Sequence, residues 1–533
     1  MPTDCIPFRD TNYFSSLICD YLDEESRLSP FYGRFPKIEN FKAQIEEKYT
    51  SFRNDSREVL VSVLKQQYSD INASTKTQLN IDALLSENTF TITTGHQLNL
   101  FTGPLYFLYK IISTINLTKE LKEAYPKYNF VPIYWMATED HDFEEINYFN
   151  YKGKKVRWDR PLAGAVGEMD LDGLDKVSKA FSEELGNSEN AKELKALFNN
   201  AYLKNDNLSE ATRYLANELF MEYGLVILDA NAKELKQLFA PYIENELLKQ
   251  TTFKAVSKTN EQLNDLSSNY KVQVNPREIN LFYLREGSRE RIVEKDGKFS
   301  VYGSDLSWSK DEIMKQLQET PERFSPNVIL RPLYQEVVLP NLCYIGGGGE
   351  LAYWFQLKAF FQDVNVPFPI LLLRNSVLIT TAKQKSKLKK LNLSINELFL
   401  DQEELISKKV KELSKVQMDF SPQKEHLKGQ FEHLYALAEK TDKSFLGAVK
   451  AQERKQIKGL EHLEKRMLKA QKKKLIEITD RIKEIQEGLF PGKSLQERNL
   501  NFSQLYLEHG KEMVEKLVEV LDPLSGKFTI LEL

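Results

Sequence analysis

Two groups of polar residues follow strand-like runs in the first third of the chain, and their side chains are of types that do chemistry. The first run, residues 90–94, leads into Gly95 and a polar turn that contains His96, Gln97, Asn99, Thr102 and Gly103. The second run, residues 130–136, leads into Thr138, Glu139, Asp140, His141, Asp142, Glu144 and Glu145. Imidazole, amide and carboxylate groups transfer protons and hold charged substrates. These two groups are therefore the first candidates for an active site.

The first group, which we call the Gly95 turn (residues 95–104), predicts a site for negative charge. Backbone N–H groups at the start of a helix attract anions, and His96 and Gln97 can donate hydrogen bonds to a charge that develops during a reaction. We interpret His96 and Gln97 as catalytic. The residues interpreted as substrate-binding are Gly95, Asn99, Thr102 and Gly103. The alternative is a turn whose glycines permit tight packing and whose histidine caps a helix.

The second group, the acidic cluster (residues 138–145), predicts a site for an amine. Asp140 and His141 are interpreted as catalytic, because a histidine beside carboxylates can take a proton from an ammonium group during amide formation. Glu139 and Asp142 are interpreted as substrate-binding. The same side chains could ligate a metal, but we assign no metal site. The alternative is a capping box in which Glu145 and its neighbours start a helix.

A third candidate is the glycine loop, Gly346–Gly349, with Glu350 directly after it. Glycines let a backbone approach a ligand closely. We therefore interpret Gly347, Gly348 and Glu350 as substrate-binding. A run of glycines also occurs in simple loops, which is the alternative.

Other reactive residue types have less distinctive surroundings. Arg374 and Asn375 end an apolar run and could reach a ligand. Cys343 lies between apolar residues, which favours a core position over a nucleophile. Four arginines are interpreted as a solvated face: Arg277, Arg285, Arg289 and Arg291.

Strand and helix patterns place the candidate sites at one sheet edge. Residues 90–94, a helix-like segment at 105–123 and residues 130–136 form a strand–helix–strand unit. Residues 224–231 and 343–345 are typical of further buried strands, as is the apolar sequence PFPILLL. This alternation predicts an α/β fold with a parallel sheet. Ligands of such sheets bind beyond the carboxyl ends of the strands.

A length of 533 residues exceeds one ordinary domain core. The predicted segments are residues 1–150 (N-terminal helices and the first half of the core), 151–320 (insertions around a core strand near 224–231), 321–380 (the second half of the core), 381–490 (a coiled coil) and 491–533 (a segment that returns to the core). Within the insertions, Asp296 and Gly297 predict a hairpin turn.

Residues 381–490 predict a long antiparallel coiled coil that forms a homodimer. Lysine and glutamate are abundant, and apolar residues such as Leu460, Leu463 and Met467 keep 3–4 spacing. We place the chain reversal near residues 419–423, because Pro422 disfavours a helix interior. The alternative is a coiled coil that packs wholly within one chain.

Composition limits the class of protein. A hydrophobic content of 41% with 28% charged residues fits a soluble globular protein. A net charge of −4 argues against nucleic-acid binding. No apolar run reaches the roughly 20 residues needed to span a bilayer, so no membrane association is expected. Three cysteines without metal-ligand spacing suggest a reducing compartment, and we expect a cytoplasmic protein.

Three long motifs resemble the cysteine-adding enzymes of bacillithiol biosynthesis, a family of cysteine ligases, and the resemblance covers nearly the whole chain. They are TGHQLNLFTGPLY, WMATEDHDFEEIN and SPNVILRPLYQEVVLPNLCYIGGGGELAYW. The resemblance implies a Rossmann-like core related to class I synthetases and nucleotidyltransferases. Gly95 and His96 match the end of the His-x-Gly-His motif of those enzymes, but Thr93 stands where its first histidine would be. No KMSKS-like sequence follows. Arg331 lies in the third motif, and we add it to the substrate-binding residues.

The resemblance also implies the reaction. The carboxyl group of cysteine would be joined to the amine of glucosaminyl malate by a carbon–nitrogen ligase, in the last step of bacillithiol biosynthesis. ATP is the expected energy source, with Mg²⁺ accompanying the nucleotide. Two alternatives remain: an adenylyl transferase that acts on another small carboxylate, and a non-catalytic coiled-coil scaffold on a degenerate Rossmann core.

Overall fold

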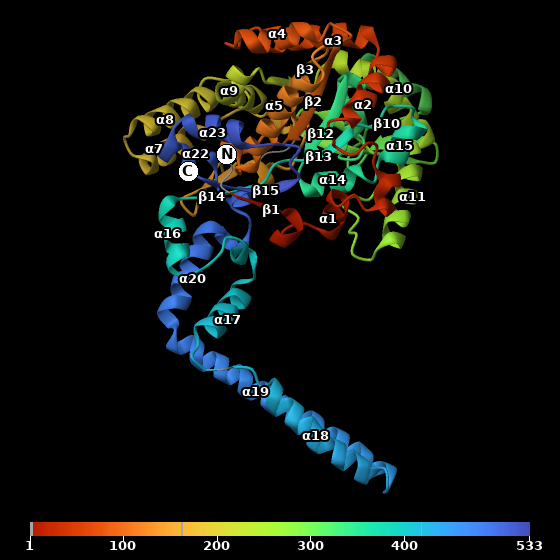
Figure 1. Cartoon of the computed structure of the whole chain (residues 1–533). Coiled ribbons are helices and arrows are strands. Elements are labelled where there is room, and N and C mark those ends of the chain that lie inside the picture. Colours follow the sequence, from red (N-terminus) through yellow and green to blue (C-terminus); the bar gives the residue numbers. More distant parts are fainter. Residues whose placement is uncertain (1–3, 161–163, 417) are drawn as a thin grey trace. The chain divides into compact units, whose positions relative to one another are not determined.

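The computed structural model describes residues 4–160, 164–416 and 418–533, which form two compact units (Figure 1). The first unit comprises Met1–Arg9, Tyr13–Ile379 and Ser494–Leu533. The second comprises Asp10–Asn12 and Thr380–Lys493. Each unit has its own internal packing, and the chain leaves the first unit once and returns to it.

A five-stranded parallel sheet is the centre of the first unit. Its order is β13 (Ile370–Leu373), β12 (Asn341–Gly346), β2 (Thr89–His96), β3 (Asn129–Met136) and β6 (Val226–Asp229). Every residue of β2 is buried, as expected for a central parallel strand covered on both faces. The predicted Rossmann-like fold and its buried strands are confirmed. The strand order reverses between β2 and β12, which is where such sheets bind ligands.

Helices cover the sheet because they have wide apolar surfaces. Helix α5 (Tyr106–Ala124) packs on β2 and β3, and α2 (Asn40–Ser51) packs on β12. Phe41 and Ile45 of α2 join Phe90, Ile92 and Cys343 in one buried cluster. Cys343 is therefore a core residue, and burial raises the pKa of its thiol. The expectation that it is not a nucleophile is consistent with this position.

The other helices around this sheet follow in chain order. They are α1 (Ser16–Leu22), α3 (Asn54–Gln67), α4 (Thr75–Ala83), α6 (Phe143–Ile146), α7 (Leu174–Leu185), α8 (Glu189–Tyr202), α9 (Leu208–Phe220), α10 (Lys233–Lys249), α11 (Thr251–Leu266), α12 (Lys310–Glu319), α13 (Arg331–Val338), α14 (Gly348–Trp354), α15 (Lys358–Asp363), α21 (Gln496–Asn499), α22 (Phe502–His509) and α23 (Glu512–Val520). The single helix expected from Glu350 to Phe361 is therefore two helices, α14 and α15, with a short break between them.

Smaller sheets complete the first unit. An antiparallel sheet has the order β10 (Ser307–Trp308), β9 (Lys298–Val301), β8 (Ser288–Lys295), β7 (Leu281–Arg285) and β11 (Phe324–Pro326); β4 (Tyr148–Tyr151) pairs with β5 (Lys154–Arg157), and β15 (Lys527–Glu532) lies between β1 (Asp4–Pro7) and β14 (Val377–Thr380). Asp296 and Gly297 have φ of 53° and 76°. Positive φ at both positions is the signature of a type I′ turn, so the predicted hairpin between β8 and β9 is confirmed.

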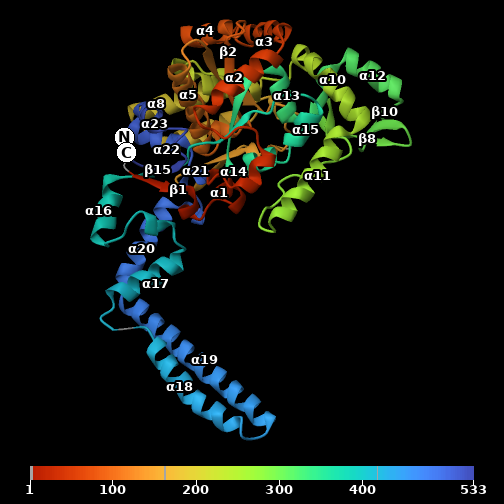
Figure 2. The ribbon, with the colours of Figure 1, turned by 45° about the vertical axis from the view of Figure 1, so that its right-hand side comes forward.

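The second unit is helical and contains α16 (Ala382–Lys390), α17 (Gln402–Leu413), α18 (Ser421–Ala438), α19 (Lys443–Lys474) and α20 (Ile476–Leu489). Figure 2 shows α18 and α19 side by side along most of α18. Phe431, Ala438 and Val449 form a buried cluster between them. The coiled coil is confirmed.

The predicted position of the chain reversal in the coiled coil is wrong. The chain reverses at residues 439–442, between α18 and α19, and not at residues 419–423. Pro422 lies in the first turn of α18, where a missing N–H removes no helical hydrogen bond. Asp442 caps α19 by accepting a hydrogen bond from the backbone N–H of Ser444. In the part of the chain that the structure describes, no helix combines the length and the apolarity needed to cross a bilayer.

Candidate active site

A cavity of about 790 Å³ lies at the carboxyl ends of the parallel strands. The Gly95 turn, the acidic cluster and the glycine loop all contribute to its lining, together with Arg331 and Arg374. These segments come from β2, β3, β12 and β13, whose carboxyl ends meet at one edge. The predicted convergence of the three groups at one sheet edge is what the structure places there.

His96 is a buried residue at the margin of the cavity. The rings of Tyr106 and Phe107 lie 5.4 and 5.1 Å from its ring, and its Nε2 has no hydrogen-bond partner. Burial and the positive charges of Lys110 and Arg374 hold the pKa of His96 well below its ordinary value. The imidazole is therefore neutral at physiological pH. It can exchange hydrogen bonds with a ligand but does not contribute a positive charge.

Asp140 joins the first two groups directly. Its carboxylate accepts hydrogen bonds from Gln97 Nε2 at 2.8 Å and from the backbone N–H of His141 at 2.8 Å. Burial alone would raise the pKa of Asp140, but its contacts with His141 and Gln97 outweigh burial and hold that pKa below its ordinary value. Asp140 is thus a fixed negative charge in the cavity wall.

Glu139 also lines the cavity, but it already has a cationic partner. The buried ammonium of Lys236 forms an ion pair with it, and Ser325 Oγ donates to its other oxygen at 3.2 Å. Lys236 further donates to the carbonyl of Phe324 at 2.8 Å. Glu139 therefore connects β3 to the neighbouring antiparallel sheet as well as facing the cavity.

Four of the predicted binding residues lie outside the cavity lining: Asn99, Thr102, Gly103 and Asp142. The turn at residues 99–103 has positive φ at Phe101, Thr102 and Gly103. Asn501 Nδ2 donates to the carbonyls of Phe101 and Gly103 at 2.7 and 2.6 Å. This part of the Gly95 turn is therefore held by the C-terminal segment instead of facing the cavity. Asp142 is exposed at the start of α6.

Glu350 lies at the centre of a charged network beside the glycine loop. Its Oε1 accepts from the hydroxyl of Tyr344 at 2.7 Å, and its Oε2 accepts from the N–H of Gly347 at 2.8 Å and pairs with Lys110 Nζ at 2.6 Å. Lys110 also donates to the carbonyl of Gly95 at 2.6 Å. Burial alone would raise the pKa of Glu350, but Lys110 and these donors keep it below its ordinary value. Lys110 thereby ties the Gly95 turn to the glycine loop.

The glycine loop has ordinary backbone angles, because none of Gly346–Gly349 has a positive φ. Space is what these glycines provide. A Cβ at Gly346 would lie 2.9 Å from side-chain atoms of both Leu351 and Tyr344. A Cβ at Gly349 would have no atom within 4 Å. The loop is thus tightly packed at its start and open at its end.

Cations dominate the side of the cavity around β12 and β13. Arg331 is stacked over Tyr344, with 5.7 Å between the guanidinium carbon and the ring centre. Arg374 pairs with the buried Glu497 at 2.7 Å, and its Nε has no partner. Together with Lys110 and the exposed Arg498, they outnumber the single free carboxylate of Glu350 on this side. Such a wall favours an anionic ligand.

Two of the arginines interpreted as a solvated face belong to the site instead. Arg289 of β8 is buried and lines the cavity, and Arg277 lines it from an exposed position. The guanidinium of Arg289 is stacked over Phe282 at 4.1 Å and donates to Ser325 Oγ at 3.0 Å. Alternation along β8 places Arg289 and Arg291 on the same face, so sequence pattern alone does not single out Arg289. The other missed residue, Lys110, could have been noticed as a lone lysine in an otherwise apolar stretch of α5.

Comparison with known families agrees with this architecture. Residues 1–375 match the family model "Bacillithiol biosynthesis BshC, N-terminal Rossmann-like domain", and residues 377–533 match "Bacillithiol biosynthesis BshC, C-terminal coiled-coil domain". A protein of Christiangramia forsetii named "Putative cysteine ligase BshC" is 59% identical over 100% of this chain and 99% of its own. Proteins with the same name from Flavobacterium johnsoniae and Staphylococcus saprophyticus are 58% and 30% identical, covering 100% and 98% of both chains in each pair.

One solved structure is also similar over much of the chain. It is described as a putative arginyl tRNA synthetase from Campylobacter jejuni, and it covers 84% of this chain and 99% of its own. The sequence identity is 12% and the TM-score is 0.21. At that score the likeness carries no argument about fold or function.

Proposed function

The chain belongs to the bacillithiol-biosynthesis BshC family, and we propose that it is a carbon–nitrogen ligase that joins the carboxyl group of cysteine to the amine of glucosaminyl malate. The observation that carries this proposal is the division of the cavity into a cationic and an acidic side. Malate carries carboxylates, which suit Arg331, Arg374 and Lys110. An ammonium group suits Asp140, whose negative charge is fixed.

The reaction needs a free amine and an activated carboxyl carbon. The amine nitrogen attacks the carboxyl carbon, a C–N bond forms, a carboxyl C–O bond breaks and the ammonium loses protons. His96 is neutral, so it can donate a hydrogen bond to the carboxyl oxygen without titrating. Asp140 orients the amine, and Gln97 keeps Asp140 in place at 2.8 Å. The narrow margin around His96, closed by Tyr106 and Phe107, limits access of water.

ATP is the proposed energy source, because a free carboxylate is a poor electrophile. The residues of this chain fit a phosphate group: Arg374 has a buried Nε without a partner, and the open end of the glycine loop leaves room for close approach. Arg374, Arg498 and the backbone of Gly348 and Gly349 would hold it. ATP would supply the activation of the cysteine carboxyl group. Mg²⁺ would arrive with the nucleotide.

Mass spectrometry of a defined mixture tests the proposal. Purified protein is incubated with glucosaminyl malate, cysteine and Mg²⁺, with and without ATP. The expected result is bacillithiol only in the sample with ATP; release of AMP would indicate adenylyl transfer and release of ADP phosphoryl transfer. The variant Arg331→Met serves as a control for dependence on the cavity. Absence of product from folded protein under both conditions would contradict the proposal.

The same assay separates the alternatives. An adenylyl transferase for another small carboxylate predicts pyrophosphate release that does not depend on cysteine. A coiled-coil scaffold predicts that exchanging His96 and Asp140 leaves function in cells intact, whereas disrupting α18 and α19 abolishes it. The buried charges around the cavity disfavour a scaffold, since buried charged groups are costly where no ligand uses them.

We further propose that the coiled coil forms a homodimer. Several apolar side chains on α18 and α19 are exposed despite the pairing of these helices: Leu434, Leu437, Phe445, Leu446 and Leu463. Leu437 and Leu463 are 56% and 53% exposed, which leaves an apolar surface for a partner helix. Sedimentation equilibrium is expected to give twice the monomer mass. The variant Leu437→Lys with Leu463→Lys is expected to shift that mass to the monomer.

A further inference from the structure

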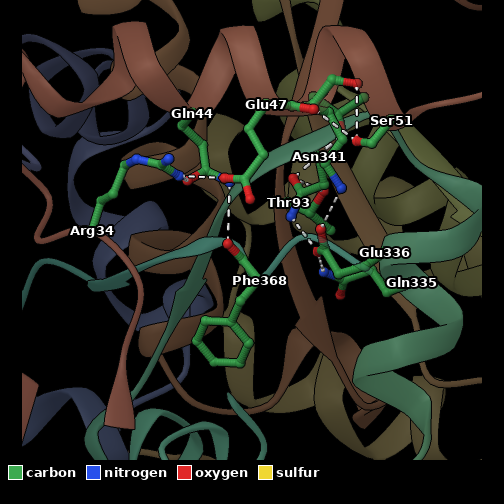
Figure 3. A network of polar contacts seen from close by, with 11 residues as sticks. Arg34, Gln44, Glu47, Ser51, Thr93, Gln335, Glu336, Asn341 and Phe368 are labelled. Atoms are coloured by element: carbon green, nitrogen blue, oxygen red, sulfur yellow. Dashed lines mark hydrogen bonds and ion pairs between the residues drawn. The ribbon is translucent and has the colours of Figure 1, made fainter. Parts of the chain in front are cut away.

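A chain of buried polar side chains connects the interior of the first unit to Arg331 at the cavity. Lys48 of α2 donates to Glu336 Oε2 at 3.1 Å, and both side chains are almost completely buried. Glu336 Oε1 accepts from Asn341 Nδ2 at 2.6 Å and from Gln335 Nε2 at 3.0 Å. Figure 3 shows Gln335, Glu336 and Asn341 converging in this network.

The network determines which way each amide points. A carboxylate only accepts hydrogen bonds, so the Glu336 side chain, facing Lys48, must receive the NH₂ group of Gln335. The oxygen of the Gln335 amide then faces the opposite way. It accepts a hydrogen bond from Arg331 Nη1 at 3.1 Å. Arg331 and Gln335 are one helical turn apart on α13, which places their side chains on one face.

The same logic fixes Asn341 in β12. Its NH₂ group faces Glu336, so its oxygen faces β2, where it accepts from the hydroxyls of Thr93 at 2.9 Å and Thr91 at 3.3 Å. Thr93 therefore belongs to the buried network that joins β2 to β12. It occupies the position at which the resembled synthetase motif has its first histidine, and here it serves the interior.

Arg331 is consequently held from both ends of its guanidinium group. Nη1 donates to Gln335, and Nη2 donates to the hydroxyl of Tyr353 at 3.3 Å. The ring of Tyr344 lies beneath the group. A guanidinium group with five N–H donors in a plane binds a carboxylate or phosphate best when that plane is fixed.

We propose that Gln335 is a positioning residue that orients Arg331 for an anionic substrate group, and that the buried Lys48–Glu336 ion pair sets the direction of the Gln335 amide. Gln335 does not touch the substrate; it acts through Arg331. The inference deepens the proposed function, on which it rests for the identity of the anion. It predicts a loss of anion affinity on changes deep in the interior that alter neither the charge nor the volume of the cavity.

The test compares two buried glutamines of the same unit. Gln335→Met removes the amide that holds Arg331 and keeps the side-chain volume. Gln44→Met is the matched control: Gln44 is also fully buried, donates to the carbonyl of Phe368 at 3.1 Å and accepts from Arg34 at 2.7 Å, but it does not contact Arg331 (Figure 3). Calorimetric titration with L-malate alone, and with inorganic phosphate alone, measures anion affinity without turnover.

The expected result is roughly tenfold weaker malate binding for Gln335→Met, corresponding to the loss of one orienting hydrogen bond to a charged group, and wild-type affinity for Gln44→Met. In the ligase assay, the KM for glucosaminyl malate rises for Gln335→Met while kcat changes little. A second variant, Lys48→Met combined with Glu336→Gln, removes the ion pair as a unit, which buried pairs tolerate better than loss of one partner. Its malate affinity is expected to fall by roughly two- to fivefold, because a neutral amide at position 336 no longer dictates the direction of Gln335.

Equal affinities for Gln335→Met and Gln44→Met would overturn the proposal, whether both are unchanged or both are reduced. So would a wild-type protein that binds neither malate nor phosphate, because Arg331 would then not be oriented for an anion. If the titrations show the expected difference but the wild type makes no bacillithiol, the positioning role stands and the proposed ligase reaction fails.

Discussion

Arg289 donates a hydrogen bond from Nη1 to Nδ1 of His141 across 2.9 Å. A guanidinium group has no acceptor, so Nδ1 of His141 must accept and a neutral ring carries its proton on Nε2. Asp140 does not compete for that nitrogen, because its Oδ1 lies 3.7 Å away, beyond hydrogen-bond distance. The geometry therefore supports His141 as a hydrogen-bond donor through Nε2. The base role that we considered from the sequence needs the Nε2 lone pair, which this tautomer does not offer.

The substitution His141→Gln tests the donor role. A glutamine Nε2 can donate from nearly the position of the imidazole Nε2, so we expect kcat/KM to stay within about tenfold of wild type. The pH–rate profile should keep its shape. Loss of a true general base would reduce the rate by roughly 10²–10⁴ and remove one limb of the profile. Initial rates between pH 6 and 9, with His509→Gln as a control far along the chain, distinguish these outcomes.

The sequence predicted the sheet well because each core strand is an apolar run bounded by turn residues. Thr89–His96 and Asn129–Met136 are buried almost throughout, and only a strand with two covered faces tolerates such composition. Their carboxyl ends could be placed together because parallel strands share an edge. The positions of Gly95, His96 and Asp140 at the cavity follow from that geometry alone.

The rest of the site depends on contacts between distant segments, which local pattern does not encode. Arg289 reaches the cavity from a separate antiparallel sheet, and Asn501 diverts the 99–103 turn from it. The exposed fraction of an arginine on a strand is set by what packs over it. For the same reason the sequence does not reveal that Gln335 faces Arg331, because the direction of a buried amide is determined by its partners in three dimensions.

Stability in acid should report the buried neutral state of His96. Its folded-state pKa is depressed, so below an unfolded-state pKa of about 6.5 the unfolded chain binds more protons than the folded one. The contribution is fully present above pH 6.5 and is lost as pH falls towards the folded pKa, by at most about 1.4 kcal/mol per pH unit. The free energy of unfolding of wild type should therefore fall more steeply between pH 6.5 and 5.5 than that of His96→Leu.

Urea unfolding followed by tryptophan fluorescence measures this difference in the first unit, because Trp135, Trp158, Trp308 and Trp354 all lie there. His509→Leu, at a partly exposed position of the same unit, is the control. Parallel pH dependences for wild type and His96→Leu would contradict the assignment of a buried neutral imidazole.

The Lys110–Glu350 ion pair should show strong energetic coupling. Lys110→Met leaves the Glu350 carboxylate beside the cavity without its cation, and we expect a loss of roughly 3–5 kcal/mol in the free energy of unfolding. Glu350→Gln keeps the shape and leaves Lys110 with the Gly95 carbonyl, at 2.6 Å. The double variant should be more stable than the sum of the two single effects by roughly 1–3 kcal/mol. Additive effects in the same urea experiment would show that the pair contributes no specific interaction.

The two ends of the glycine loop should respond in opposite ways to alanine. At Gly346 a methyl group would meet Leu351 and Tyr344 at 2.9 Å, so Gly346→Ala should destabilise the protein by roughly 1–3 kcal/mol. At Gly349 the methyl group meets nothing within 4 Å, and the residue lies in α14. Alanine is the better helix former, so Gly349→Ala should stabilise the protein by up to about 1 kcal/mol.

Activity then separates a packing role from a ligand role for this loop. Gly349 lines the cavity, and a methyl group there occupies space that a bound ligand needs. We expect Gly349→Ala to lower kcat/KM by roughly tenfold or more while raising the midpoint of urea unfolding, as stability and activity often oppose each other at binding sites. A Gly349→Ala enzyme that is both more stable and fully active would mean that the open end of the loop does not contact the ligand. The tight packing at Gly346 would then be sufficient to explain why glycines stand at the start of this loop.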